Sequence, residues 1–489
     1  TWSCTGSNAN GYPDAANENA IVNGSLVVTI SGGGALTVGD VTLDADGAIL
    51  SSVSNNVRTV SVQDLTLSQT ADPNQFRNTF LQLQNSAAGI GLLIRGDFSL
   101  NGSAPDIDPN PNSPITFGGT SNQNISGNFL NVNNNALGDV QIDNAGNTVS
   151  FGGSTFFSDL DIPNGTAEFQ SNVTSTGDVS LTGGDLSFQR ATTLRGDVTV
   201  GTGTTLTLGV FTVSIAGDFT MNGTLTTQGT NTVNLVPASG ATSTVSGTGT
   251  LQFADLDVSG SGSVRLDNDI LLSLNLDAGS GTFDGSGSGD ITFNGGRSQD
   301  LSAPSKTLPS VTVTNNSSVS VVDITVSGDK TIIDGDLIID AGSSFDLGGI
   351  SSDNLQVNGN VTANGPLALS GGGLNTGLEV GGDLALGSTF SNEGDRVIMN
   401  GSSAQTISGD FSGDGDNQNG IDDNAFDVLE IANTSGGVTA QDSVVVTSGL
   451  ELTSGNFGTG NLRLPSGVAI TRTSGTMTSS GDRIQRTIT

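Results

Sequence analysis

The sequence predicts an all-β protein, a right-handed parallel β-helix in which the chain winds into stacked coils. Three times between Gly177 and Gly223, a Gly-Asp pair leads into a short alternating strand, at Asp178, Asp197 and Asp218. The spacings are 19 and 21 residues. Strand-type alternation that recurs every roughly 20–24 residues is typical of a solenoid. A chain of 489 residues would then form roughly 20 coils of about 19–24 residues each.

The alternation also predicts which side chains fill the core, since successive residues of a strand point to opposite faces. In the three strands that define the repeat, the apolar residues occupy every second position. Thr199 and Thr220 should therefore point outward. The residues expected to point inward are Val179, Leu181, Val198, Val200, Phe219 and Met221.

Composition limits the possible functions. The chain carries 48 acidic and 14 basic residues, no histidine, and a formal net charge of −34. It lacks the positive charge that nucleic acids and anionic membranes require, so neither is an expected partner. It also has no run of 18 apolar residues, so we expect no insertion into a membrane as a helix.

The missing histidine also bears on catalysis. It excludes Ser-His-Asp and Cys-His arrangements and histidine-ligated zinc. The aspartate, histidine and basic clusters by which some β-helices cleave pectin are not present either, and the only Asp-Asp pair is Asp422-Asp423. We therefore expect a protein that is not an enzyme.

The chain divides into a short N-terminal segment and a long solenoid. Residues 1–24 hold the single Trp2, Tyr12 and Cys4, and we interpret them as a cap, because an open solenoid end exposes unpaired strand edges. The solenoid would occupy residues 25–489, with loop insertions near 71–85, 103–114 and 409–425. Prolines within 103–114 argue against a central strand there.

A second, longer repeat overlies the coil repeat. The segment from Ile115 to Ser126 recurs at Ile291 to Ser302 and at Val397 to Ser408. Gln follows Phe or Met by six positions in every copy: Phe117 and Gln123, Phe293 and Gln299, Met399 and Gln405. Two nested periods are further evidence for a repeat architecture.

These motifs resemble the repeat-rich, β-helical cell-surface proteins of gliding and polymer-degrading bacteria. The pattern I-T-F-x-G…Q-x-I-S-G, followed by F-x-x-L-x-I as at Phe426, Leu429 and Ile431, carries the resemblance. Such proteins are commonly exported by the type IX secretion system. The resemblance implies a secreted bacterial protein that is extracellular or at the cell surface.

The densest acidic cluster lies between Gly409 and Asp427. Carboxylate and amide oxygens in a Gly-rich loop are ligands that Ca²⁺ prefers, and the loop resembles the calcium loops of thrombospondin-type repeats. Its spacing departs from theirs near Gln418, and the alternative interpretation is a solvated acidic loop between two strands. The candidate ligands are Asp414, Asp416, Asn417, Asn419, Asp422 and Asp423. A weaker candidate combines Asp106, Asp108, Asn110 and Asn112.

Two Arg-Gly-Asp tripeptides occur, at Arg95–Asp97 and Arg195–Asp197. Integrin ligands carry this tripeptide on a loop tip, whereas here Gly-Asp opens many coils. We therefore interpret both tripeptides as coil openings.

We expect a non-enzymatic extracellular structural or adhesive protein. It would be a rigid β-solenoid rod that serves as an adhesin stalk or as a filament subunit stacked head to tail with copies of itself. Surface glycans or other cells are further possible partners. The alternative is a carbohydrate-binding or polysaccharide-cleaving β-helix, against which the scarcity of His, Trp and Tyr counts. Stacking should also align Asp and Asn into acidic ladders, which we expect cations to stabilise.

Overall fold

The computed structural model is an all-β solenoid of parallel strands, which confirms the predicted fold class. It has about 16 turns, slightly fewer than the roughly 20 expected, because some coils are longer than the basic repeat. Phe98, for example, pairs with Leu65, 33 residues earlier. The structure describes residues 2–5, 19–22, 27–30, 36–44, 49–52, 58–68, 80–82, 90–101, 106–108, 114–130, 136–303, 305–314, 323–327, 330–347, 354–369, 377–392, 394–411, 424–479 and 484–486.

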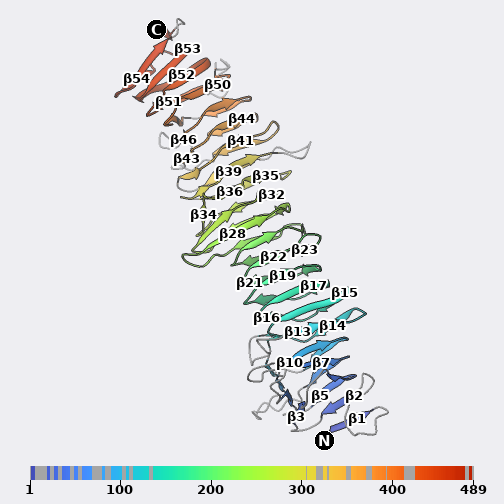
Figure 1. Cartoon of the computed structure of the whole chain (residues 1–489). Helices are drawn as coiled ribbons and strands as arrows, with labels where there is room; N and C mark the ends of the chain where they lie inside the picture. The colour runs from blue at the N-terminus through green and yellow to red at the C-terminus, as the bar shows by residue number, and fades with distance from the viewer. Residues whose placement is uncertain are drawn as a thin grey trace. The chain divides into compact units, whose positions relative to one another are not determined.

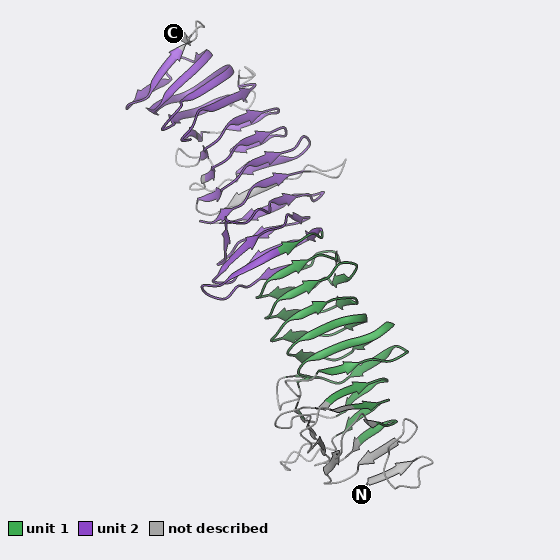
Figure 2. Cartoon of the chain, in the orientation of Figure 1, with its two compact units in different colours: residues 1–232, 246–249 green, residues 233–245, 250–489 purple. Residues whose placement is uncertain are grey.

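The chain forms two compact units (Figure 2). Unit 1 comprises residues 1–232 and 246–249, and unit 2 comprises residues 233–245 and 250–489. β27 (Thr232–Leu235) and β28 (Thr242–Gly247) contribute residues to both. In each unit the described strands form three ladders of parallel strands, which the chain crosses in turn (Figure 1).

The three ladders of unit 1 are named 1a, 1b and 1c. Ladder 1a contains β2 (Asn19–Val22), β5 (Val41–Asp44), β8 (Leu65–Ser68), β11 (Phe98–Asn101), β14 (Gln123–Ser126), β15 (Val140–Phe151), β17 (Leu160–Phe169), β20 (Asp185–Phe188), β23 (Thr205–Leu208) and β26 (Thr224–Thr227). Ladder 1b contains β4 (Leu36–Thr37), β7 (Arg58–Val62), β10 (Ile90–Ile94), β13 (Ile115–Phe117), the first halves of β15 and β17, β19 (Val179–Leu181), β22 (Val198–Val200) and β25 (Phe219–Met221). Ladder 1c consists of two runs: β3 (Val27–Ile30), β6 (Ile49–Ser52), β9 (Phe80–Gln82) and β12 (Asp106–Asp108), then β16 (Thr155–Phe157), β18 (Val173–Ser175), β21 (Thr192–Leu194) and β24 (Val213–Ile215).

Unit 2 repeats this arrangement in ladders 2a, 2b and 2c. Ladder 2a contains β29 (Leu251–Phe253), β32 (Ile270–Leu272), β35 (Ile291–Phe293), β38 (Val311–Val313), β41 (Leu337–Ile339), β44 (Val361–Ala363), β47 (Leu384–Leu386), β50 (Gln405–Gly409), β52 (Val438–Ser454), β53 (Asn456–Leu464) and β55 (Thr476–Ser479). Ladder 2b contains β31 (Ser263–Leu266) and β34 (Thr282–Asp284), then β37 (Thr307–Leu308), β40 (Thr331–Ile333), β43 (Asn354–Val357), β46 (Gly377–Val380), β49 (Arg396–Met399), β51 (Phe426–Ala432), the second half of β52, and β54 (Ala469–Arg472). Ladder 2c contains β30 (Asp255–Val258), β33 (Leu276–Asp277), β36 (Gln299–Ser302), β39 (Asp323–Ser327), β42 (Ser344–Leu347), β45 (Leu367–Leu369) and β48 (Phe390–Asn392), while β56 (Ile484–Arg486) pairs with the end of β53.

Strands of neighbouring coils pair in register, so like side chains stack. Val179 lies opposite Val198, which lies opposite Phe219. The inward residues predicted for these strands are all buried, and Thr199 and Thr220 are not, which confirms the predicted alternation. Burial of these stacked apolar columns supplies the main driving force for folding.

Phenylalanine rings form part of the core of unit 1. Phe169 is 1% exposed, and its ring centroid lies 4.4 Å from that of Phe151, 5.7 Å from that of Phe157 and 5.6 Å from that of Phe188. Ring pairs at these separations are favourable beyond the area they bury.

Several segments singled out in the sequence can be placed in part. In residues 1–24, β1 (Trp2–Thr5) pairs antiparallel with β2, which in turn pairs parallel with β5. Within the expected insertions near 71–85 and 103–114, β9 and β12 form strands that pair with each other, so residues 106–108 extend a ladder despite the flanking prolines. The rest of both segments, apart from Pro114, lies outside the described residues.

Candidate functional site

The six candidate Ca²⁺ ligands, from Asp414 to Asp423, lie outside the described residues. The two flanks of the segment are described. Asn424 has a left-handed backbone (φ 59°), and it exchanges two hydrogen bonds with Phe390: its N–H donates to the Phe390 carbonyl oxygen, and its Oδ1 accepts the Phe390 N–H, both at 2.7 Å. The rings of Phe390, Phe411 and Phe426 pack together between these flanks, with centroids 4.6–5.9 Å apart. The described flanks of the acidic segment therefore meet at a buried aromatic cluster.

The weaker cation candidate lies on β12. Ile107, between Asp106 and Asp108, is fully buried, and Asn110 and Asn112 lie outside the described residues. Over the described part of the chain, no three acidic, cysteine or histidine side chains lie close enough together to hold a metal ion.

The corner aspartates of unit 1 form a continuous column, here named column 1b because each member precedes a strand of ladder 1b. Its members are Asp139, Asp159, Asp178, Asp197 and Asp218. Each side chain accepts a hydrogen bond from the backbone N–H of the next member, with N–O distances of 2.7–2.8 Å from Asp159 onward. The predicted acidic ladder is therefore present, and each carboxylate serves as an acceptor for the following coil.

This geometry explains why Gly precedes Asp at these corners. A Cβ atom on Gly177 would lie 1.8 Å from Asp159 Oδ1, and one on Gly196 would lie 2.4 Å from the carbonyl carbon of Gly177. At Gly177 and Gly196 the missing side chain lets the carboxylate of one coil reach the backbone of the next, whereas Ser158 holds the corresponding position before Asp159. The Gly-Asp repeat thus reflects the short distance between neighbouring coils at these corners.

Unit 2 has an equivalent column in front of ladder 2a, here named column 2a. The N–H of Asn360 donates to Asp336 Oδ1 (2.7 Å), that of Asp383 to Asn360 Oδ1 (2.8 Å), and that of Thr406 to Asp383 Oδ1 (2.7 Å). Neutral side chains alternate with carboxylates here. The full column is Asp269, Asp290, Ser310, Asp336, Asn360, Asp383 and Thr406.

The glutamines of the long repeat are buried, with exposures of 0–2%. Gln405 Nε2 donates to the carbonyl oxygens of Val380 (2.9 Å) and Gly382 (2.6 Å), the residues three and one before Asp383 of column 2a. Its Oε1 accepts the N–H of Gly401 at 2.9 Å and Nδ2 of Asn433 at 2.9 Å. One side chain thus joins three successive coils.

The other two copies use the same device. Gln123 Nε2 donates to Ile94 and Gly96, and Gln299 Nε2 donates to Leu272 and Leu274, in each case to carbonyl oxygens of the preceding coil. A buried carbonyl without a partner is costly, so these bonds account for the invariant Gln of the repeat. The sequence showed the pattern but gave no reason for it.

Both Arg-Gly-Asp tripeptides lie at coil corners. Asp97 Oδ1 accepts the N–H of Asn124 and Asp197 Oδ1 accepts that of Asp218, both at 2.8 Å. Gly96 is buried against Gln63 and Asp64. These aspartates hold neighbouring coils together, as the coil-opening interpretation expects.

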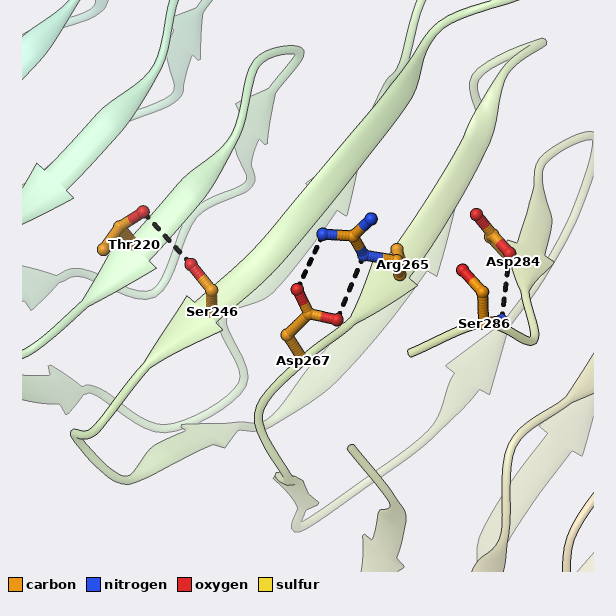
Figure 3. A network of polar contacts seen from close by, with 6 residues as sticks. All are labelled: Thr220, Ser246, Arg265, Asp267, Asp284 and Ser286. Carbon is orange, nitrogen blue, oxygen red and sulfur yellow. Dashed lines mark hydrogen bonds and ion pairs between the residues drawn. The ribbon is translucent and has the colours of Figure 1, made fainter. Parts of the chain in front are cut away.

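Ion pairs lie on the outer surface of unit 2. Arg396 contacts Glu430 (2.9 Å) and Glu451 (3.1 Å) on the next two coils, and Lys330 contacts Glu379 at 2.9 Å. Arg265 and Asp267 form a two-bond pair, shown in Figure 3 beside Asp284, whose carboxylate accepts the N–H of Ser286. In unit 1, the hydroxyls of Thr220 and Ser246 lie 3.2 Å apart (Figure 3).

Several carboxyl groups have shifted pKa values. Burial raises the pKa of Asp139, the charge of Asp159 raises it further, and the hydrogen bond from the Asp159 N–H opposes both. Burial also raises the pKa of Asp257, aided by Asp277 and Asp255. The pKa of Asp284 is lowered, chiefly by its hydrogen bonds from Ser286. Asp277 stacks in register with Asp257 on the next coil, whereas Asp255 lies on the same strand, and both like charges raise the pKa of Asp257.

No family model, curated protein or solved structure matches this chain. None of the described residues belongs to a helix of the length and apolarity needed to span a membrane.

Proposed function

We propose that this chain is a non-enzymatic structural or adhesive protein of the bacterial cell surface. In this proposal it is secreted and forms a rigid solenoid segment. It serves either as the stalk of an adhesin or as a subunit that stacks head to tail into an extracellular filament. Surface glycans and other cells are the partners of the adhesin form, and further copies of the chain are those of the filament form.

One observation carries the proposal: the polar groups at the coil corners bond to the coils themselves. The carboxylates of columns 1b and 2a accept backbone N–H groups, and the buried glutamines join successive coils. Such internal use of polar side chains suits a protein whose role depends on stiffness. The net charge of −34 suits a soluble surface that repels nucleic acids and anionic membranes.

Electron microscopy of native extracellular material tests this function. Periodic fibres that contain the chain would favour the filament, and single projections tethered to cells would favour the stalk. Cleavage of a polysaccharide by the pure protein would overturn both structural forms. Enzymatic assays on a panel of acidic and neutral polysaccharides therefore belong in the same study.

The acidic segment is part of the same proposal as a Ca²⁺ site. Calorimetric titration of the chain with Ca²⁺ should show binding that an Asp414→Asn, Asp416→Asn double variant loses. The matched control is an Asp161→Asn, Asp300→Asn variant, which removes the same charge outside both cation candidates. Equal heats for all three proteins would remove Ca²⁺ from the proposal and leave a solvated acidic loop.

A further inference from the structure

Two Asn-Gly pairs of unit 2 belong to the long repeat. Asn294-Gly295 precedes Gln299, and Asn400-Gly401 precedes Gln405. In both, the glycine N–H donates to Oε1 of the buried glutamine, at 3.1 Å for Gly295 and 2.9 Å for Gly401. The glutamine thus binds the backbone nitrogen of the glycine, which is the atom that attacks the asparagine side chain during deamidation.

Asparagine is a thermolabile residue, and glycine after it exposes the backbone because it has no Cβ. In deamidation, the glycine nitrogen loses its proton and bonds to Cγ of the asparagine, while the Cγ–Nδ2 bond breaks and ammonia leaves. Water then opens the succinimide ring to aspartate or isoaspartate. The product carries one more negative charge at neutral pH.

We propose that Gln299 and Gln405 protect the preceding Asn-Gly pairs from this spontaneous modification. The nitrogen cannot lose its proton or turn toward Cγ while its N–H donates to a buried amide oxygen. Gln405 is itself fixed, because Nε2 bonds to two carbonyl oxygens and Oε1 also accepts from Asn433. Reaction at Asn400 therefore requires several buried hydrogen bonds to break together.

Asn400 has a second restraint. Its Nδ2 donates to Glu379 Oε2 at 3.0 Å, and Glu379 also pairs with Lys330. The side-chain amide is thereby held on the outer surface of ladder 2b, so its Cγ is restrained from turning toward the Gly401 nitrogen.

Asn222-Gly223 in unit 1 lacks this protection and is the modification site we assign. Asn222 Oδ1 accepts the N–H and the hydroxyl of Thr248, at 3.2 and 3.4 Å, so its side chain is restrained as that of Asn400 is, and the two sites differ in the glycine nitrogen. Within residues 136–303, the N–H of Gly223 has no hydrogen-bond acceptor. The pair also lies at a turn between β25 and β26, where no glutamine of the long repeat stands.

The test is to age the purified chain at mildly alkaline pH and to follow each peptide by mass spectrometry. Asn222 should convert at least about fivefold faster than Asn400, the factor expected from one buried hydrogen bond. A Gln405→Leu variant should accelerate Asn400 by a similar factor and leave Asn294 unchanged. A Gln299→Leu variant should accelerate Asn294 and leave Asn400 unchanged. In each variant, the unaffected asparagine is thus an internal reference.

An Ile407→Ala variant controls for simple loosening of the coil, because it keeps Gln405 and removes a buried neighbour on the same strand. It should accelerate Asn400 less than Gln405→Leu does. Equal rates at Asn222 and Asn400 in the unaltered chain would overturn the proposal, and that comparison needs no variant to fold. An equal effect of Ile407→Ala and Gln405→Leu would overturn it as well.

Discussion

Columns 1b and 2a meet the same requirement with different charge. Column 1b stacks five consecutive aspartates, whereas column 2a places a serine, an asparagine and a threonine among its aspartates. The bonded distances between Asx residues are alike, 2.7–2.8 Å in column 1b and 2.7–2.9 Å in column 2a. The next coil therefore needs an oxygen acceptor at this position, and the negative charge is incidental to the bond.

The two units also differ in how their charges are balanced. The ion pairs found among the described residues join side chains of unit 2, on ladder 2b and at its edge. The stacked carboxylates of column 1b repel one another, and salt screens that repulsion. Unit 1 should thus be the more sensitive of the two to ionic conditions, and unit 2 to loss of its buried bonds.

The largest expected effect tests the cores. Phe169→Ala should destabilise unit 1 by about 3–5 kcal/mol, because the ring is buried among Phe151, Phe157 and Phe188. Leu378→Ala, in a fully buried column of unit 2, should cost about 2–5 kcal/mol there. Hydrogen exchange read peptide by peptide should show each loss near its own mutation. Uniform loss of protection over both units would contradict the separation into two compact units.

A smaller effect tests the close approach of the coils. Gly196→Ala should cost about 1–3 kcal/mol, since the new Cβ meets backbone atoms of Gly177 at 2.4 Å. Gly359→Ala should cost about as much in unit 2, where the Gly335 oxygen lies 2.5 Å away.

Gly152→Ala is the matched control for these glycine variants, with its nearest neighbour at 3.8 Å, and should be nearly neutral. Denaturant midpoints measure all three variants. If the control is as unstable as the other two, the argument from close approach fails.

A reciprocal exchange tests the charge difference directly. Asp178→Asn keeps the acceptor and removes one of five stacked charges, so it should stabilise unit 1 by roughly a few tenths of a kcal/mol. Asn360→Asp should destabilise unit 2 by a similar amount, because it adds a charge between Asp336 and Asp383. Both effects should shrink as salt is raised, measured as melting temperature at several ionic strengths. Changes of the same sign would show that the bond, rather than the charge, had been altered.

The smallest effect is in pH dependence. The folded pKa of Asp139 is raised, so its unfavourable contribution is absent below the unfolded pKa and grows as pH rises through the folded pKa. This group therefore favours the fold more as pH falls from neutral toward about 4.

Asp284 in unit 2 has a lowered pKa, and its contribution is lost as pH falls through that value. In plots of stability against pH, Asp139→Asn should remove the gain in stability toward acidic pH, and Asp284→Asn should remove the loss of stability toward acidic pH. Parallel plots for both variants and the parent chain would refute the assignment.

The fold was predictable because its signals are local and repeated. The alternation at Val179 and Leu181 and the recurrence of Gly-Asp predict strand, face and period without reference to distant residues. The partners of Gln405 could not be predicted in this way. They lie on carbonyl groups 23 and 25 residues earlier and on Asn433, 28 residues later, and they appear only when coils are placed in register.

The same limit applies at the corners. The sequence identified Asp as the residue that opens a coil, and it predicted acidic ladders, but it did not predict that each Asp side chain bonds to the backbone of the next coil. The antiparallel pairing of β1 with β2 was also not predicted, because the connection between them, residues 6–18, is much longer than the two-residue turns that specify a hairpin. Local patterns therefore predicted the architecture, whereas the contacts between coils required the three-dimensional structure.

The bonds of the two columns all have one direction: the acceptor stands on the earlier coil and the donor arrives with the later one. A chain is synthesised from its N-terminus. In these columns, the side-chain oxygen of each coil is therefore synthesised before the backbone N–H that will bond to it. Each coil can then act as a template for its successor, and assembly can advance in the order of synthesis.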